Sequence, residues 1–209
     1  MGTYLEEIRK SMKLLASEGY YLIGQNTKYG GTSMYHTTKD FPEERRIELP
    51  VTEEMQMGIG TGMSLEGLKV CSIYPRMDFL ILAMNQLINH LDKAEKMSDG
   101  QFKPKIIIRT CVGSIKPMMP GPQHMQNYTK ALRNMVTNIE IRELLKTEDV
   151  YKAYKEAVES DKSFIIIEHS DFYNRDLAFT DIKQSKEKPD RTDWDNPKTR
   201  MVTDVFKEK

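Results

Sequence analysis

The sequence predicts an α/β fold with a doubly wound, mainly parallel sheet and helices on both faces. Six short β-like runs alternate with segments of helical periodicity, and several of the runs are apolar almost without a break. A strand of this kind fits a parallel sheet that helices cover on both sides, since neither face of the strand meets water. The 209 residues suffice for one such core and a short appendage.

The first predicted element is an amphipathic helix over residues 4–17. Its apolar residues recur every three or four positions, and Gly19 follows as a stop signal. The predicted strands come next, as short runs rich in apolar residues. These runs cover residues 20–24, 45–50, 68–74, 105–110, 138–145 and 163–170.

Three further helices are predicted between the strands. The first covers residues 53–67, with Thr52 as a plausible N-cap and Gly67 as a stop. The second is a long helix over 77–97 that is apolar on more than one side, and the third covers 148–160. Together with the strands, these helices predict one domain over residues 1–174.

Residues 175–209 differ in character from the rest of the chain. They are highly charged and show little apolar periodicity, although Trp194 and the segment 202–206 could pin them to a surface. We expect an extended or partly disordered tail here rather than a second domain.

The composition excludes several classes of function. Lys plus Arg and Asp plus Glu both total 31, so the net charge is zero, which argues against a general nucleic-acid binder. No apolar run approaches the roughly 20 residues of a membrane-spanning helix. The two cysteines, Cys71 and Cys111, lie outside any metal or disulfide motif, which favours a reducing, cytoplasmic setting.

Three residues are candidates for chemistry, and each also has an ordinary structural interpretation. Glu53 starts the helix over 53–67, where an acid commonly complements the helix dipole. His124 lies in a loop with three prolines and a glycine, where histidines are usually solvated, yet such a histidine can transfer protons near neutral pH. Phe79 lies near the start of the long apolar helix, where an aromatic residue is usually part of the core.

The glycines at 58, 60 and 62 permit two interpretations. A phosphate-binding loop is one, but these glycines lie within a helical pattern and do not directly follow a strand. The other is a helix thinned so that another chain can approach closely. The sequence shows no metal-ligand cluster, nucleophile elbow, P-loop or GxGxxG motif, so pattern alone predicts only a cytosolic α/β domain.

A series of short motifs adds to this prediction. The motifs occupy, in order, residues 20–31, 50–53, 58–62, 67–69, 78–79, 86–89, 98–101, 106–109, 123–126 and 165–174. The series resembles the beta subunit of 2-oxo acid dehydrogenases, the pyrimidine-binding half of the pyruvate, branched-chain and acetoin dehydrogenase first components. The resemblance covers roughly residues 3–174 and implies a transketolase-like pyrimidine-binding domain that uses thiamine diphosphate.

The resemblance also implies roles for single residues. Glu53 matches the Glu that hydrogen-bonds the aminopyrimidine ring of thiamine diphosphate and activates the cofactor. Phe79 matches the aromatic residue that stacks on the pyrimidine. His124 matches the loop histidine that faces the substrate and handles protons around its 2-oxo group. Gln25 stands where the family has an acid that helps to link two active sites, which makes it a fourth implied site residue.

The sequence departs from the family at several places. Gln25 replaces that acid, Ile73 stands where the third strand usually ends on Glu, and Met125 replaces a common Ser. The family's second domain, which contributes dimer contacts and docking on the acyltransferase core, has no counterpart in residues 175–209.

The resemblance further implies partners. The sequence has no GDG motif followed by two asparagines, so the diphosphate and its magnesium are expected on a separate alpha-like subunit. A homodimer of this chain would then form part of an α2β2 assembly that decarboxylates a 2-oxo acid. Two alternatives stay open: a standalone decarboxylase, acyloin-forming or transketolase-like subunit, and a truncated, noncatalytic scaffold.

Overall fold

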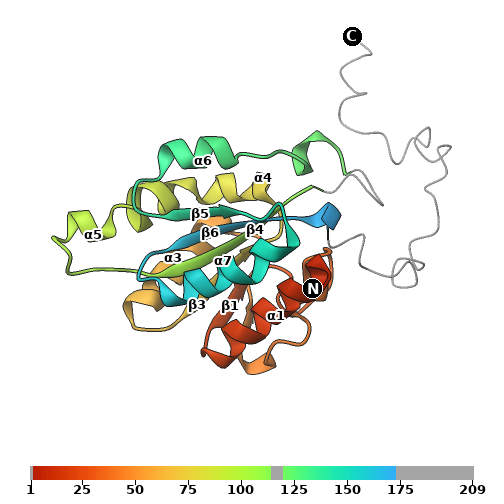
Figure 1. The fold of residues 1–209 in the computed structure, drawn as a ribbon. Coiled ribbons are helices and arrows are strands. Elements are labelled where there is room, and N and C mark those ends of the chain that lie inside the picture. Colours follow the sequence, from red (N-terminus) through yellow and green to blue (C-terminus); the bar gives the residue numbers. More distant parts are fainter. Residues whose placement is uncertain (1, 114–119, 173–209) are drawn as a thin grey trace, which may run out of the picture. The chain divides into compact units, whose positions relative to one another are not determined.

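A computed structural model describes residues 2–113 and 120–172, and the tail predicted over 175–209 lies outside the described residues. Six strands form one sheet in the order β2-β1-β3-β4-β6-β5, and every pair of neighbouring strands is parallel (Figure 1). The predicted doubly wound α/β fold is therefore confirmed. The strands are β1 (Tyr21–Gly24), β2 (Arg46–Glu48), β3 (Val70–Tyr74), β4 (Ile106–Val112), β5 (Glu140–Glu143) and β6 (Phe164–His169).

One face of the sheet is covered by α1 (Tyr4–Ser17), α2 (Tyr35–Thr38) and α7 (Thr147–Glu159), with α1 packed against the other two. Helix α1 begins with a capping box, in which the Thr3 side chain accepts the Glu6 amide and the Glu6 side chain accepts the Thr3 amide. The predicted helices over 4–17 and 148–160 are thus confirmed within one residue at each end.

The other face carries α3 (Glu53–Leu65), α4 (Met77–Leu80) and α6 (Thr129–Met135), and its apolar side chains form one buried cluster with the strands. Gly60 of α3 faces this cluster, where an added Cβ would lie 3.2 Å from Ile23 Cδ1. The glycine therefore brings α3 close to its own sheet, so the expectation that it serves the approach of another chain is wrong. An added Cβ at Gly62 would meet nothing within 4 Å, and there the expectation stays a prediction.

The helix predicted over residues 77–97 is wrong as a continuous element. Helix α4 passes into a 3-10 turn, a π-helical segment and a last short α-helix. These are η2 (Ile81–Ala83), η3 (Gln86–Leu91) and α5 (Ala94–Met97). The remaining short 3-10 turns of the fold are η1 (Glu43–Arg45) and η4 (Pro122–His124).

The buried residues of this segment change their spacing where the winding changes. Met77, Leu80 and Ala83 are buried at intervals of three, whereas Leu87 and Leu91 follow at intervals of four. The shorter interval coincides with the 3-10 turn and the longer one with the π-helical segment. All five residues belong to the buried cluster against the sheet.

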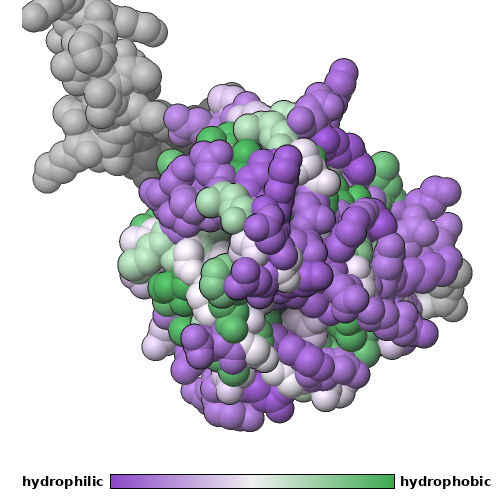
Figure 2. All heavy atoms as spheres, turned by 90° about the vertical axis from the view of Figure 1, so that its left-hand side faces the viewer, coloured by the Kyte–Doolittle hydropathy of each residue, from purple (hydrophilic) through white to green (hydrophobic). Residues whose placement is uncertain are grey.

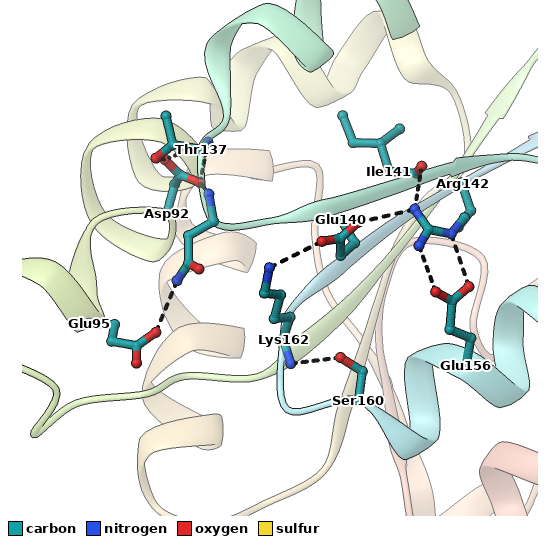
Figure 3. Close-up of polar contacts among 10 residues, drawn as sticks. Asp92, Glu95, Thr137, Glu140, Ile141, Arg142, Glu156, Ser160 and Lys162 are labelled. Atoms are coloured by element: carbon teal, nitrogen blue, oxygen red, sulfur yellow. Dashed lines mark hydrogen bonds and ion pairs between the residues drawn. The ribbon is translucent and has the colours of Figure 1, made fainter.

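The side of the molecule that carries α5 is mostly hydrophilic (Figure 2). On this side Asp92 accepts the backbone amides of Thr137 and Asn138, and Lys162 pairs with Glu140 (Figure 3). Burial would raise the pKa of Asp92, but the hydrogen bonds from Lys93, Asn138 and Thr137 together lower it. These polar groups are satisfied by one another, so this side fits a structural role.

Two sequence-based expectations concern chemistry outside the site. Cys71 and Cys111 are both buried, and burial raises the pKa of the Cys71 thiol to about 12, so that it stays protonated. Across residues 2–113 and 120–172, no helix is long and apolar enough to cross a membrane.

Candidate functional site

The candidate site lies at the carboxyl ends of the strands, where the winding of the sheet reverses. The chain leaves β1 for its neighbour β2, then crosses back over β1 to β3. In open α/β sheets ligands bind outside the carboxyl ends of the strands at such a reversal. Gln25 directly follows β1, and Glu53 starts the helix that follows β2.

The start of α3 is fixed to the neighbouring strands by polar contacts. Gln56 Nε2 donates to Ser72 Oγ at 3.0 Å and to the Ile73 carbonyl at 2.8 Å, and the Tyr74 hydroxyl donates to the Glu53 carbonyl at 3.3 Å. The Thr52 side chain, predicted to cap α3, instead donates to the Pro50 carbonyl at 3.3 Å. Position 53 is therefore held mainly by β3.

The end of β1 must come unusually close to these groups. Gly24 has a φ of 131°, and a Cβ added to it would lie 2.4 Å from the Ile73 carbonyl oxygen. Only glycine permits this approach and this backbone angle without strain. The glycine thereby places Gln25 beside Glu53.

Glu53 is buried, with 4% of its surface exposed, and its carboxylate has one described partner. Gln25 Nε2 donates to Glu53 Oε1 at 3.1 Å, whereas Oε2 accepts no hydrogen bond from the residues that the structure describes. Glu53 also lines an open hollow of about 760 Å³, together with Gly58, Leu82 and Gln86. An acid that only complemented the helix dipole would gain nothing from burial, since burial penalises its charge.

Glu48, at the end of β2, fixes the loop that follows Gln25. Its carboxylate accepts the backbone amides of Asn26, Thr27 and Lys28 at 2.7–2.8 Å, and the Thr27 hydroxyl at 2.9 Å. Burial would raise the pKa of Glu48, but these hydrogen bonds together lower it below its ordinary value. Glu48 was not among the residues predicted from the sequence, although an acid that ends a strand beside polar turn residues is a usable signal.

Phe79 and His124, predicted as separate candidates, lie side by side. Their ring centroids are 5.2 Å apart in an edge-to-face arrangement, and both residues are half-buried. The Nδ1 atom of His124 is buried and has no partner in the described part of the chain. A freely solvated surface histidine, the ordinary alternative for this loop, would keep this nitrogen in water.

The turn after β3 holds the segment that carries His124. Arg76 Nη1 donates to the carbonyl oxygens of Gly113 and His124, at 3.1 and 3.3 Å. Asp78 Oδ1 accepts the amide of Gln126 at 3.2 Å. Arg76 was not among the residues predicted from the sequence, although it is a charged residue just beyond the carboxyl end of a buried strand.

The predicted site residues therefore lie in two pairs at the carboxyl ends of the strands. Glu53 lies with Gln25, and Phe79 lies with His124; no described contact joins the two pairs directly. Within residues 2–113 and 120–172, no three His, Cys, Asp or Glu side chains are grouped so that they could hold a metal ion.

Residues 9–175 match the family model described as transketolase, pyrimidine binding domain. Curated relatives include the chloroplastic pyruvate dehydrogenase E1 component subunit beta-3 of Oryza sativa subsp. japonica, 30% identical over 70% of this chain and 37% of that protein. The mitochondrial subunit beta of Dictyostelium discoideum is 26% identical over 84% of this chain and 49% of its own length.

A solved structure titled split gene transketolase, inactive beta4 tetramer, has a TM-score of 0.61 at 17% identity, over 80% of this chain and 51% of that one. At this identity the likeness shows the fold alone. The chain spans between about a third and a half of the length of the curated relatives that it matches.

Proposed function

Because this chain belongs to the family of transketolase pyrimidine-binding domains, we propose that it is the beta-type subunit of a two-chain thiamine-diphosphate enzyme that decarboxylates a 2-oxo acid. The pyruvate dehydrogenase beta subunits among its relatives support this reaction class. The observation that carries the proposal is the Glu53 carboxyl group, which is buried, fixed at Oε1 and without a described partner at Oε2.

The residues of the site fit the pyrimidine half of thiamine diphosphate. A carboxyl oxygen without a described partner, on a buried residue that lines an open hollow, suits a ring nitrogen, and the flat Phe79 side chain suits an aromatic ring. The cofactor, when bound, supplies the carbanion-stabilising chemistry. In this proposal an alpha-like subunit holds the diphosphate and magnesium, and two copies of this chain form an α2β2 assembly with it.

Glu53 and Gln25 act together in this proposal. The Gln25 amide donates to Oε1, so a proton carried by the Glu53 carboxyl group belongs on Oε2, toward the cofactor ring. An amide holds the carboxyl group in place but has no acidic proton to pass on. Gln25 therefore orients Glu53 without relaying its proton to a second site.

His124 acts on the substrate in this proposal. It is the histidine of the Phe79 pair, and imidazole can hold or release a proton near neutral pH. Its Nδ1 is buried and has no described partner, so in this proposal the other ring nitrogen, Nε2, faces the 2-oxo group. The cytoplasmic location also remains part of the proposal.

Reconstitution tests this function. The chain is co-expressed with a diphosphate-binding alpha-like subunit, purified with thiamine diphosphate and magnesium, and assayed for carbon dioxide release from a panel of 2-oxo acids. We expect co-purification and release from at least one substrate. Cofactor binding with transfer to an aldehyde, but without carbon dioxide, would instead support the acyloin-forming or transketolase-like alternative. A complex that binds no cofactor would support the scaffold.

A further inference from the structure

Arg76 carries an unused hydrogen-bonding edge at the candidate site. Both described hydrogen bonds of its guanidinium come from Nη1, which is fixed by the carbonyl oxygens of Gly113 and His124. Nε and Nη2 have no partner among residues 2–113 and 120–172. These two nitrogens form the edge of the guanidinium that binds a carboxylate with two parallel hydrogen bonds.

The charge of Arg76 is not neutralised within the described chain either. None of the ion pairs formed by residues 2–113 and 120–172 includes Arg76. The nearest acid in sequence, Asp78, uses Oδ1 to accept the Gln126 amide. Arginine stays protonated at physiological pH, so a half-buried, oriented cation lies beside the His124 segment.

We propose that Arg76 determines substrate specificity by binding the second carboxylate of a 2-oxo dicarboxylic acid. The inference rests on the proposed function and names the substrate class of the same site. Two backbone carbonyls hold one end of the guanidinium, so little side-chain freedom is lost when an anion binds the other end. The contact to the His124 carbonyl places the guanidinium beside the segment that carries the histidine proposed to face the 2-oxo group.

The carboxylate that leaves as carbon dioxide is a poor match for Arg76. Its negative charge is lost during decarboxylation, so a cation bound to it would stabilise the substrate more than the transition state and would slow the reaction. A carboxylate at the far end of the substrate keeps its charge throughout. Arg76 can bind that group equally at every stage, which raises affinity without slowing the chemical step.

Two five-carbon substrates test the inference, because 2-oxoglutarate and 2-oxopentanoate differ only in a terminal carboxylate or methyl group. For the reconstituted enzyme, kcat/KM should favour 2-oxoglutarate. In Arg76→Gln that preference should fall about 10- to 100-fold, the usual range for hydrogen bonds to a charged partner, with KM carrying most of the change. Arg76→Lys should recover part of the preference, because it keeps the charge but loses the two-pronged geometry. Lys130→Gln, which removes an exposed charge from α6, should leave the preference unchanged.

A binding measurement separates this inference from the proposed function. The isolated chain is titrated with each compound while the His124 imidazole signals are followed by NMR, and only 2-oxoglutarate should shift them in an Arg76-dependent way. That result without turnover of any 2-oxo acid would retain the Arg76 site and reject the decarboxylase. Equal losses for both substrates in Arg76→Gln would show that Arg76 only positions His124, and weaker co-purification of the alpha-like subunit would show that it binds the partner. Either outcome overturns the inference.

Discussion

Two buried acids on opposite faces of the sheet differ in how fully their hydrogen bonds are used. Glu168, beneath α1 and α7, accepts Arg109 Nε and Nη2 at 2.6 and 2.8 Å and the Tyr154 hydroxyl at 2.5 Å. Arg109 also donates to Thr37 Oγ1 at 2.7 Å. Glu53 has a single described partner on one oxygen. Both acids are nearly inaccessible to water, so burial alone does not distinguish them.

The difference separates a polar group that stabilises the fold from one that is available to a ligand. Both oxygens of Glu168 are bound within its own chain, and burial together with its charge raises the pKa of Tyr154 well above the ordinary value. A buried ion pair of this kind specifies how α1 and α7 pack on the sheet. Glu53 has acceptor capacity left over at a place where ligands bind, and that capacity is what a cofactor site requires.

The largest expected effect is on catalysis, from Glu53→Gln. The amide keeps the shape of the side chain but cannot exchange a proton, so turnover of the reconstituted enzyme should fall about 100- to 10,000-fold. The melting temperature should change little, since Gln25 remains a possible partner. Glu54→Gln, at an exposed neighbouring position, is the matched control and should retain activity. Full activity of Glu53→Gln would show that Glu53, like Glu168, stabilises the fold and takes no part in catalysis.

The next largest effect is on stability, from Arg109→Met. It leaves Glu168 buried without its ionic partner, and the free energy of unfolding should fall by about 3–5 kcal/mol in chemical denaturation. The double variant Arg109→Met with Glu168→Gln should recover much of this loss, because no charge then remains buried. Lys155→Met, which breaks an exposed pair with Glu159, should cost about 1 kcal/mol or less. An equal loss in both single variants would remove the distinction between buried and exposed pairs.

The sequence predicted much of the fold, but less of the difference in hydrogen bonding between Glu168 and Glu53. All six strands overlap the predicted β-like runs, and the pattern is clearest in the central strands β1, β3, β4 and β6, which are buried on both faces of the sheet. The edge strands β2 and β5 are shorter and more polar. The change of winding within 77–97 could not be predicted, because apolar residues at intervals of three and four are equally typical of a uniform α-helix. The site residues Glu53 and His124 stood out only through the family resemblance.

Contacts between distant segments are the part that the sequence could not show. Arg109 and Glu168 are 59 residues apart, and Arg76 is 48 residues from His124. Their hydrogen bonds depend on the order of β3, β4 and β6 in the sheet. A charged residue inside or just beyond an apolar strand indicates that a partner exists, but only the fold identifies it.

A smaller, pH-dependent effect should arise from Glu48, which is satisfied like Glu168 but supports the candidate site. Its folded pKa lies below the ordinary value of 4.5. The stability that it contributes is therefore complete above about pH 4.5 and is lost as the pH falls through the lower, folded pKa. At pH 7 Glu48→Gln should lower the free energy of unfolding by about 1 kcal/mol, and the difference from wild type should shrink toward pH 3.

Urea denaturation of both proteins between pH 3 and 7 measures this effect, with the exposed Glu44→Gln as a control of equal charge change. Because Glu48 fixes the loop after Gln25, its variant should also lower turnover more than the control does. A constant stability difference across this pH range would mean that the carboxylate charge of Glu48 does not contribute.

The smallest effect concerns two glycines of α3, of which Gly60 packs against the core and Gly62 has no described neighbour within 4 Å. Gly62→Ala should raise the free energy of unfolding of the isolated chain by about 0.5–1 kcal/mol, because alanine favours a helix and its methyl group meets no described atom. Gly60→Ala should show no such gain, since its methyl group crowds Ile23 in the core. Thermal melts of both variants measure this difference. If another chain approaches α3 at Gly62, the alanine that stabilises the isolated chain must also weaken assembly, and unchanged co-purification would place the partner elsewhere.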